Sequence, residues 1–431
     1  MAGNPSKADF NIQKNTVLCS KTNQYLVEDI LGCGGYGQVV SCKKLGTDET
    51  VAIKVVKQSK YASGKNEMKI LKAIREFKSD KSNIVCFLEH FDYQNQFCLA
   101  LERLDINLHD FIKCKYFVPL DVNEIRVIAQ QLLVALNVLK NMGVTHRDIK
   151  CDNIMLVDHV LQPLSVKLID FGLSTRTYNL TNLRFKQPLS YRSPDVILDL
   201  PLDEAIDMWG LGCVLSFLYL GRHLFPSGSE YETLSVMIKL LGQPHDTLLT
   251  CAFSTDTFFK CVTGEFTHSW LLKTADEYVK DSGEQIVLRR GVYSDLNSLD
   301  DLQNMRPQAK DPFEKADLLS FIDLLKQILD INPSRRITPI NGLNHEFITM
   351  KHLSGATNSP YVTTSYKKME KHPETEPEVG ESTPPGPSQS QTAEESLDSG
   401  KNKADKHSLP PVPNSDSAIR MQRRTYFGKQ T

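Results

Sequence analysis

Short runs in which apolar and polar residues alternate fill the first hundred positions of the chain. A period of two residues is typical of β-strands, and glycine or turn-like residues separate the runs. The pattern predicts strands at residues 25–31, 39–44, 50–55, 85–93 and 97–103. A helical period over residues 66–77 falls between the third and the fourth strand. The first part of the chain is therefore expected to be small and rich in β-structure.

Helical periodicity dominates the positions that follow. Apolar residues recur at helical spacing over residues 125–139, and Gly143 provides a stop signal. Residues 206–220 are apolar on every face, so this helix is expected to be buried. An amphipathic helix is expected at 314–330, after a partly helical surface insert at about 255–312. The predicted fold class is α+β, with a larger helical second part.

The two ends of the chain differ from the middle in composition. Residues 1–24 are polar and mixed, which predicts a loose terminus. Nine of the 21 prolines fall between residues 360 and 413, and no aromatic residue occurs between residues 366 and 426. Such a segment buries too little apolar surface to offset the entropy of ordering. Residues 350–431 are therefore predicted to be a disordered tail.

The overall composition excludes some classes of protein. The net charge of −2 gives no general attraction to nucleic acids or membranes, and the longest apolar run, residues 211–220, is too short to span a bilayer. The ten cysteines lack the paired spacing of metal sites, and no secretory signal precedes them. They are expected to be reduced thiols of an intracellular protein.

Four motifs with chemical character follow one another between residues 32 and 172. The first contains glycines at 32, 34 and 37, where backbone amides could approach phosphate oxygens closely. By itself this motif is equally well explained as an ordinary turn. A dinucleotide-binding fold would need a helix at the last glycine, whereas residues 39–42 continue as a strand. The other three motifs are Val51-Ala52-Ile53-Lys54, the polar residues 146–153 and Asp170-Phe171-Gly172.

Lys54 closes an apolar strand, where a lysine is usually a solvated surface residue. Because the glycine motif lies one strand earlier, Lys54 is interpreted as a partner of nucleotide phosphates, and it then needs a carboxylate to hold it. Glu67 shares a helical face with apolar residues, whereas Glu76 shares one with lysines. The helical phase therefore favours Glu67 over Glu76.

Taken in this order, the motifs resemble those of eukaryotic protein kinases over roughly residues 25–349. The resemblance implies a bilobal fold, with an N-lobe at 25–104 and a C-lobe at 105–349, and it implies ATP and Mg²⁺ as cofactors. Asp148 would orient the substrate hydroxyl and accept its proton, and Lys150 would steady the γ-phosphate. Lys54 would hold the α- and β-phosphates, and Glu67 would fix its ammonium.

The same resemblance implies two metal ligands and a set of residues around the nucleotide. Asp170 would bind Mg²⁺, since a hard cation prefers oxygen ligands, and Asn153 would supply a second contact. For the apolar members, ordinary core packing is an alternative explanation that is compatible with this role. The nucleotide-binding residues implied are Leu31, Gly32, Gly34, Gly37, Val39, Ala52, Lys54, Leu101, Glu102, Leu104 and Met155.

Within the kinases, the chain is most similar to the CMGC group and its homeodomain-interacting protein kinases, relatives of the dual-specificity tyrosine-regulated kinases. The similarity lies in residues 207–213, in the insertion after Leu241, and in residues 321–325 and 336–340. It implies Ser/Thr transfer to protein substrates, a location in the nucleus or the cytoplasm, and no direct binding to nucleic acid or membrane. It covers only the catalytic domain, so homeodomain partners are not implied.

The loop before Ser193-Pro194-Asp195 departs from that family. The tyrosine position falls on Phe185, the Ser/Thr that normally bonds the catalytic aspartate falls on Pro188, and an arginine position falls on Leu189. Asp195 replaces the usual glutamate that pairs with an arginine such as Arg336. Two alternatives to a protein kinase therefore stay open, a kinase-fold scaffold that acts by binding partners and a small-molecule kinase.

Overall fold

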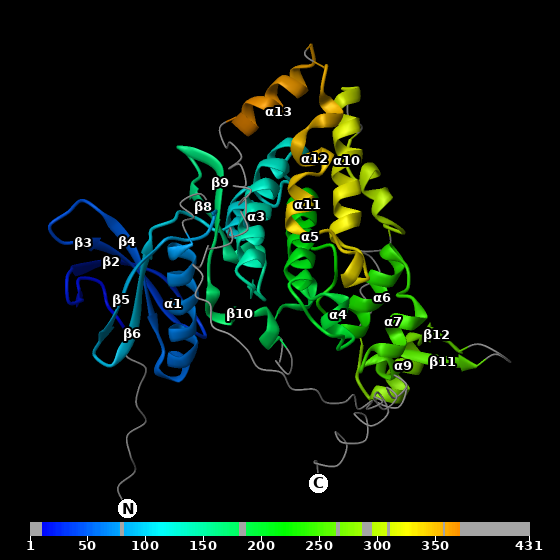
Figure 1. Cartoon of the computed structure of the whole chain (residues 1–431), viewed down its shortest axis with the longest axis horizontal. Helices are drawn as coiled ribbons and strands as arrows, with labels where there is room; N and C mark the ends of the chain where they lie inside the picture. Colours follow the sequence, from blue (N-terminus) through cyan, green and yellow to red (C-terminus); the bar gives the residue numbers. More distant parts are fainter. Residues whose placement is uncertain are drawn as a thin grey trace, which may run out of the picture. The chain divides into compact units, whose positions relative to one another are not determined.

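The computed structural model describes residues 11–77, 82–180, 187–263, 268–286, 295–307, 311–356 and 358–370, all within one compact unit (Figure 1). The first part is a six-stranded antiparallel sheet with strand order β1-β2-β3-β4-β6-β5. Helix α1 (Tyr61–Glu76) packs against strands β5 and β6 of this sheet. The strands are β1 (Val17–Cys19), β2 (Gln24–Cys33), β3 (Gly37–Lys44), β4 (Thr50–Val56), β5 (Phe87–Tyr93) and β6 (Gln96–Glu102).

The alternating pattern of the strands gives the sheet two buried faces. Along β6, Cys98 and Ala100 belong to a core that the sheet forms on one side. Phe97 and Leu99 point the other way and join the main core of the molecule. Ile70 of α1 lies in that main core as well. The period of two therefore decides which strand residues face the helix.

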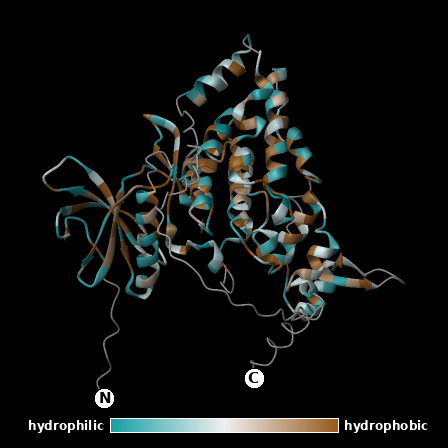
Figure 2. Cartoon of the chain, viewed as in Figure 1, coloured by the Kyte–Doolittle hydropathy of each residue, from teal (hydrophilic) through white to brown (hydrophobic). Residues whose placement is uncertain are grey.

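The second part of the described chain is mostly helical, with a few short strand pairs. Figure 2 shows apolar residues alternating with hydrophilic ones along many of its helices. The helices are α2 (Leu108–Cys114), α3 (Val122–Asn141), α4 (Pro194–Ile197), α5 (Ala205–Leu220), α6 (Glu230–Leu241), α7 (Asp246–Cys251), α8 (Thr255–Phe258), α9 (Ala275–Ser282), α10 (Pro312–Ile328), α11 (Pro339–Leu343), α12 (Glu346–Thr349) and α13 (Pro360–Glu370). The strands are β7 (Val144–Thr145), β8 (Ile154–Asp158), β9 (Gln162–Leu168), β10 (Thr175–Arg176), β11 (Phe259–Thr263) and β12 (His268–Leu272). The predicted α+β fold, with a β-rich first lobe and a helical second lobe, is confirmed.

Helices α3 and α5 form the centre of the helical lobe. A capping box of Asp121 and Glu124 begins α3, and Gly143 follows its end with a φ of 61°. Residues 206–219 of α5 are all buried, as its uniformly apolar sequence predicts. Helix α3 is long and apolar enough to cross a membrane, but 78% of its apolar window is buried inside the protein, as in a core helix.

The insert at about 255–312 contributes to the core where it is described. Its α8 ends at Phe258, whose buried ring stacks on Tyr278 of α9 at 5.9 Å between centroids. Tyr278 stacks in turn on Tyr231 of α6 at 4.5 Å. The surface insert expected from the sequence is therefore anchored to the helical lobe by aromatic rings.

The N-terminal segment is more ordered than the sequence suggested. Strand β1 pairs with β2, and the side chain of Ile12 is fully buried. The Gln38 side chain binds the Ile12 backbone twice, accepting from its N–H at 2.9 Å and donating to its carbonyl at 2.8 Å. The described residues 11–24 therefore pack on the sheet and supply its first strand, so the predicted loose terminus is wrong for them, whereas residues 1–10 lie outside the described residues. The polar composition of this segment hid its fully buried apolar residues, Ile12 and Leu18.

The predicted start of the tail at residue 350 also differs from the structure. Met350, Leu353, Ala356 and Val362 form a small buried cluster that continues into α13. The hydroxyl of Tyr361 donates to the buried carboxylate of Asp317. Composition averaged over a proline-rich stretch missed these contacts, because they depend on a partner in α10. The rest of the predicted tail, residues 371–431, lies outside the described residues.

Truncation of the chain tests this docking. A chain that ends at residue 349 should melt at least about 3 °C below one that ends at residue 370. It loses two or more well-buried side chains, each of which contributes about 1.5–3 kcal/mol. Differential scanning calorimetry of the two truncated chains measures the difference. Equal melting temperatures would show that α13 contributes nothing to stability.

Candidate active site

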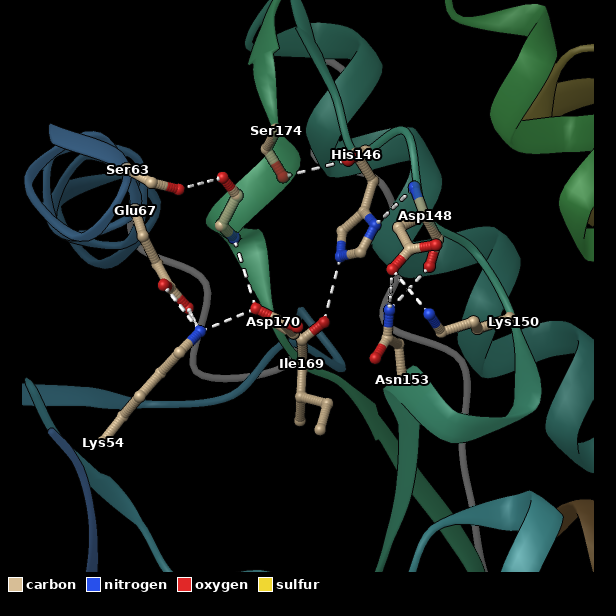
Figure 3. A network of polar contacts seen from close by, with 11 residues as sticks. Lys54, Ser63, Glu67, His146, Asp148, Lys150, Asn153, Ile169, Asp170 and Ser174 are labelled. Atoms are coloured by element: carbon tan, nitrogen blue, oxygen red, sulfur yellow. Dashed lines mark hydrogen bonds and ion pairs between the residues drawn. The ribbon is translucent and has the colours of Figure 1, made fainter. Parts of the chain in front are cut away.

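The polar motif residues from distant parts of the sequence converge in one site (Figure 3). The ammonium of Lys54, on β4, lies 2.9 and 2.8 Å from the two carboxylate oxygens of Glu67, on α1. It also lies 2.7 Å from Oδ1 of Asp170, although 116 residues separate the two in sequence. Glu76 is exposed and faces Lys72 at 3.9 Å. The structure therefore places Glu67, and not Glu76, against Lys54.

The charges of this triangle do not cancel. Burial by itself would lower the pKa of Lys54, but Glu67 and Asp170 together raise it well above its usual range. Burial would raise the pKa of Asp170, but the neighbouring Lys54 outweighs this and holds it below its usual range. One ammonium thus faces two carboxyl groups, the buried Glu67, whose pKa is raised by burial and lowered by Lys54, and the half-buried Asp170. The excess negative charge favours an added cation.

The polar loop of residues 146–153 is held by a carboxylate beneath it. The backbone N–H groups of His146 and Arg147 donate to the two oxygens of Asp207, on α5, at 2.6 and 2.8 Å. Arg147 has a φ of 72°, a strained conformation for an arginine. Burial raises the pKa of Asp207 to about 7, and the two amides oppose this shift. Asp207 therefore fixes a loop geometry that local sequence alone would not favour.

Within the loop, one carboxylate oxygen of Asp148 accepts hydrogen bonds and the other accepts none. Its Oδ2 accepts from Nζ of Lys150 and from Nδ2 of Asn153, both at 2.8 Å. Asn153 also donates to the Asp148 carbonyl at 2.8 Å. The other oxygen, Oδ1, is buried and has no hydrogen-bond partner among the described residues. A buried acceptor without a donor is costly, so it is a feature expected at a functional site.

Helix α1 is tied directly to the segment that follows Asp170. Ser63 Oγ donates to the Gly172 carbonyl at 2.6 Å, and Asn66 Nδ2 donates to the Ser174 carbonyl at 2.8 Å. Ser174 Oγ in turn donates to the His146 carbonyl at 3.3 Å. These bonds tie the helix that carries Glu67 to the segment that follows Asp170. The sequence did not predict these roles of Ser63, Asn66 and Ser174, since nothing local distinguishes them from other polar residues.

The three predicted glycines serve the backbone in different ways. A Cβ on Gly37 would lie 2.0 Å from the Val55 carbonyl oxygen, so the fold itself requires glycine there. Around Gly32 and Gly34 there is open space within 4 Å of the place a Cβ would take. Neither has a positive φ. Packing therefore explains why residue 37 is a glycine. At Gly32 and Gly34 there is space for a bound group to approach the backbone.

The other residues predicted to bind the nucleotide come from several strands. Leu31 is exposed, Leu104 is buried, and four others are half-buried, namely Val39, Ala52, Leu101 and Met155. Ala52 and Leu101 are cross-strand partners, as are Val39 and Lys54. The carboxylate of Glu102 is held by Lys167 at 2.7 and 2.8 Å. Glu102 could therefore take part through its backbone alone.

The loop with unusual residues is partly described. Phe185 lies outside the described residues, whereas Pro188 is exposed and Leu189 half-buried. Asp195 and Arg336 are both buried, and their Oδ1 and Nη2 atoms lie 2.8 Å apart. The predicted pairing of these two residues is confirmed, and the shorter aspartate still reaches the arginine.

A family model described as the protein kinase domain matches residues 25–348 of the 431. The chain belongs to the protein kinase family. Its Lys54–Glu67–Asp170 triangle and the loop around Asp148 both lie inside the matched range.

Among curated proteins, the chain is similar to homeodomain-interacting protein kinases, which confirms the predicted resemblance. It is 41% identical to kinase 2 of Mus musculus over 377 residues, covering 86% of this chain and 31% of that protein. It is 39% identical to kinase 1 of Caenorhabditis elegans, covering 84% and 45% of the two chains. For kinase 4 of Homo sapiens the identity is 33%, with 82% and 59% covered. The chain thus spans about a third of the length of the mouse relative.

Proposed function

We propose that this chain transfers the γ-phosphate of ATP to serine or threonine hydroxyls of protein substrates. The observation that carries the proposal is the assembled site, in which Lys54 binds both Glu67 and Asp170 while one oxygen of Asp148 has no hydrogen-bond donor among the described residues. Phosphate transfer depends mainly on alignment and on neutralising charge, and these residues can supply both.

The residues present fit ATP and Mg²⁺. The excess negative charge at Asp170 suits a hard divalent cation, which Asp170 and Asn153 would hold. Bound there, Mg²⁺ supplies positive charge that stabilises the phosphate oxygens. The open space around Gly32 and Gly34 suits phosphate oxygens close to the backbone amides. The half-buried side chains of Val39, Ala52, Leu101 and Met155 would provide apolar contacts for adenine.

The polar residues of the site would then have separate roles in phosphate transfer. Lys54, held in place by Glu67, would bind the α- and β-phosphates through its ammonium. Asp148 Oδ1 would accept the hydrogen bond of the substrate hydroxyl and then its proton. Lys150, which already pairs with Asp148, would offset negative charge at the γ-phosphate. The Asp207 contacts keep this loop in its unusual backbone conformation.

A scaffold that binds ATP without transfer is the second candidate. It is favoured by Pro188, which replaces the hydroxyl residue expected to contact Asp148, and by Leu189 in place of an arginine. A transfer assay separates the two functions, because a scaffold would bind Mg-ATP and leave added protein unlabelled.

The similarity to homeodomain-interacting kinases also supports a location in the nucleus or the cytoplasm, which a fluorescent fusion would test.

The test of the proposed function uses the full chain, Mg-ATP and a generic basic protein. We expect labelling of serine and threonine, which phosphoamino-acid analysis identifies, and loss of labelling when EDTA removes Mg²⁺. Asp148→Asn should lower the rate by about 10²-fold or more, since the general base is removed. A wild-type chain that binds ATP but transfers no phosphate to any hydroxyl would favour the scaffold.

A further inference from the structure

Lys167, on β9, forms hydrogen bonds to both carboxylate oxygens of Glu102, although the pair is partly exposed. Its Nζ lies 2.7 Å from Oε1 and 2.8 Å from Oε2, and the two side chains are 25% and 24% exposed. Oε1 also accepts from the backbone N–H of Cys86 at 2.6 Å. The carboxylate at the end of β6 is therefore fixed by an ammonium and an amide together.

These bonds close a ring between β6, β9 and the segment before β5. The Glu102 N–H donates to the Cys86 carbonyl at 3.0 Å. The neighbouring Val85 N–H donates to the Leu168 carbonyl at 3.0 Å, and Leu168 follows Lys167 directly. Since every member of the ring is bonded to the next, Glu102 cannot shift along β9 without breaking the Lys167 ion pair.

Lys167 is also close in the structure or the sequence to three parts of the proposed nucleotide site, namely Met155, residues 102–104 and Asp170. Its cross-strand partner on β8 is Met155, one of the half-buried residues proposed to contact adenine. Residues 102–104 include Glu102 and Leu104, two of the predicted nucleotide-binding residues, and the next residue, Asp105, donates its N–H to the Leu156 carbonyl at 3.0 Å. Asp170 follows Lys167 by three positions.

We propose that Lys167 is a positioning residue for the nucleotide. By holding Glu102, it sets the backbone of residues 102–104 at a fixed distance from Met155, and so determines how well adenine fits between them. The inference rests on the ATP site of the proposed function. The phosphate end of that site is held separately, by Glu67 and Asp170 around Lys54. Lys167 should therefore govern nucleotide affinity and leave the transfer step unchanged.

The test replaces Lys167 by methionine, which keeps the length of the side chain and removes its charge. We expect the KM for ATP and the Kd for adenosine to rise about tenfold, as loss of a charged hydrogen bond near a binding surface typically causes. The kcat should change less than twofold. Lys167→Arg keeps the charge and the donors and should restore most of the affinity.

A matched control is Lys326→Met, which breaks the ion pair of Lys326 with Asp300 on the helical lobe and should change neither constant. Adenosine has no phosphates, so its Kd separates the adenine end from the rest of the site. Unchanged adenosine affinity in Lys167→Met, or a fall in kcat at constant KM, would overturn the inference. If the wild type bound neither adenosine nor Mg-ATP, the proposed function itself would fail instead.

Discussion

Replacement of Asp170 by asparagine is expected to lower the rate of phosphate transfer by about 10²–10³-fold, which corresponds to about 3–4 kcal/mol of barrier. The change removes the charge that would hold Mg²⁺ and leaves the buried Lys54 facing Glu67 alone. Without the excess negative charge, the site loses its attraction for a divalent cation. The rate is measured with Mg-ATP at saturating protein substrate, beside a titration of Mg²⁺.

Asparagine is the suitable replacement because of the backbone at this position. Asp170 has a φ of 61°, which asparagine adopts more readily than most residues. Its side-chain oxygen can still accept the Gly172 N–H, which lies 3.4 Å from Oδ1. Asp300→Asn, at an exposed ion pair, serves as the control and should transfer at the wild-type rate. Wild-type transfer by Asp170→Asn would mean that Asp170 does not bind the metal.

The second large effect is expected at Lys54. Lys54→Met should lower kcat/KM by about 10²-fold, since the ammonium is proposed to bind the nucleotide phosphates. Glu67→Gln should lower it by about tenfold, because the amide can still accept a hydrogen bond from Lys54 but no longer holds it by charge. Steady-state kinetics with ATP as the varied substrate gives the three values.

Glu76→Gln is the internal control for this series. Glu76 lies on the same helix as Glu67 but is exposed, so its change should leave the kinetics within twofold. Thermal melting of each variant separates loss of catalysis from loss of fold, since Lys54→Met leaves the buried Glu67 and the half-buried Asp170 carboxylates without their ammonium. Equal kinetic losses for Glu67→Gln and Glu76→Gln would contradict the placement of α1.

Helix α13 and the N-terminal segment at residues 11–24 show where composition was a poor guide. Both segments are polar on average, yet each is anchored by a few apolar side chains, such as Ile12 and Val362. A short window of sequence does not show that the Gln38 side chain will accept a hydrogen bond from the Ile12 backbone. Nor does it show that Asp317 will accept one from the Tyr361 hydroxyl. Whether such a segment folds depends on the surface it meets, and that surface is built from residues far away in the chain.

The sequence by itself determined the strands, the main helices and the identity of the motif residues. Periods of two and of 3.6 residues decide which side chains face inward, and for this reason the choice of Glu67 over Glu76 needed no structure. The tertiary structure alone decided the partners across the fold. These partners lie at least 60 positions apart in the sequence. They are Asp207 with the N–H groups of the loop at 146–147, Ser63 and Asn66 with the segment after Asp170, and Lys167 with Glu102. Local patterns carry no signal for such pairs, because packing of the whole chain brings them together.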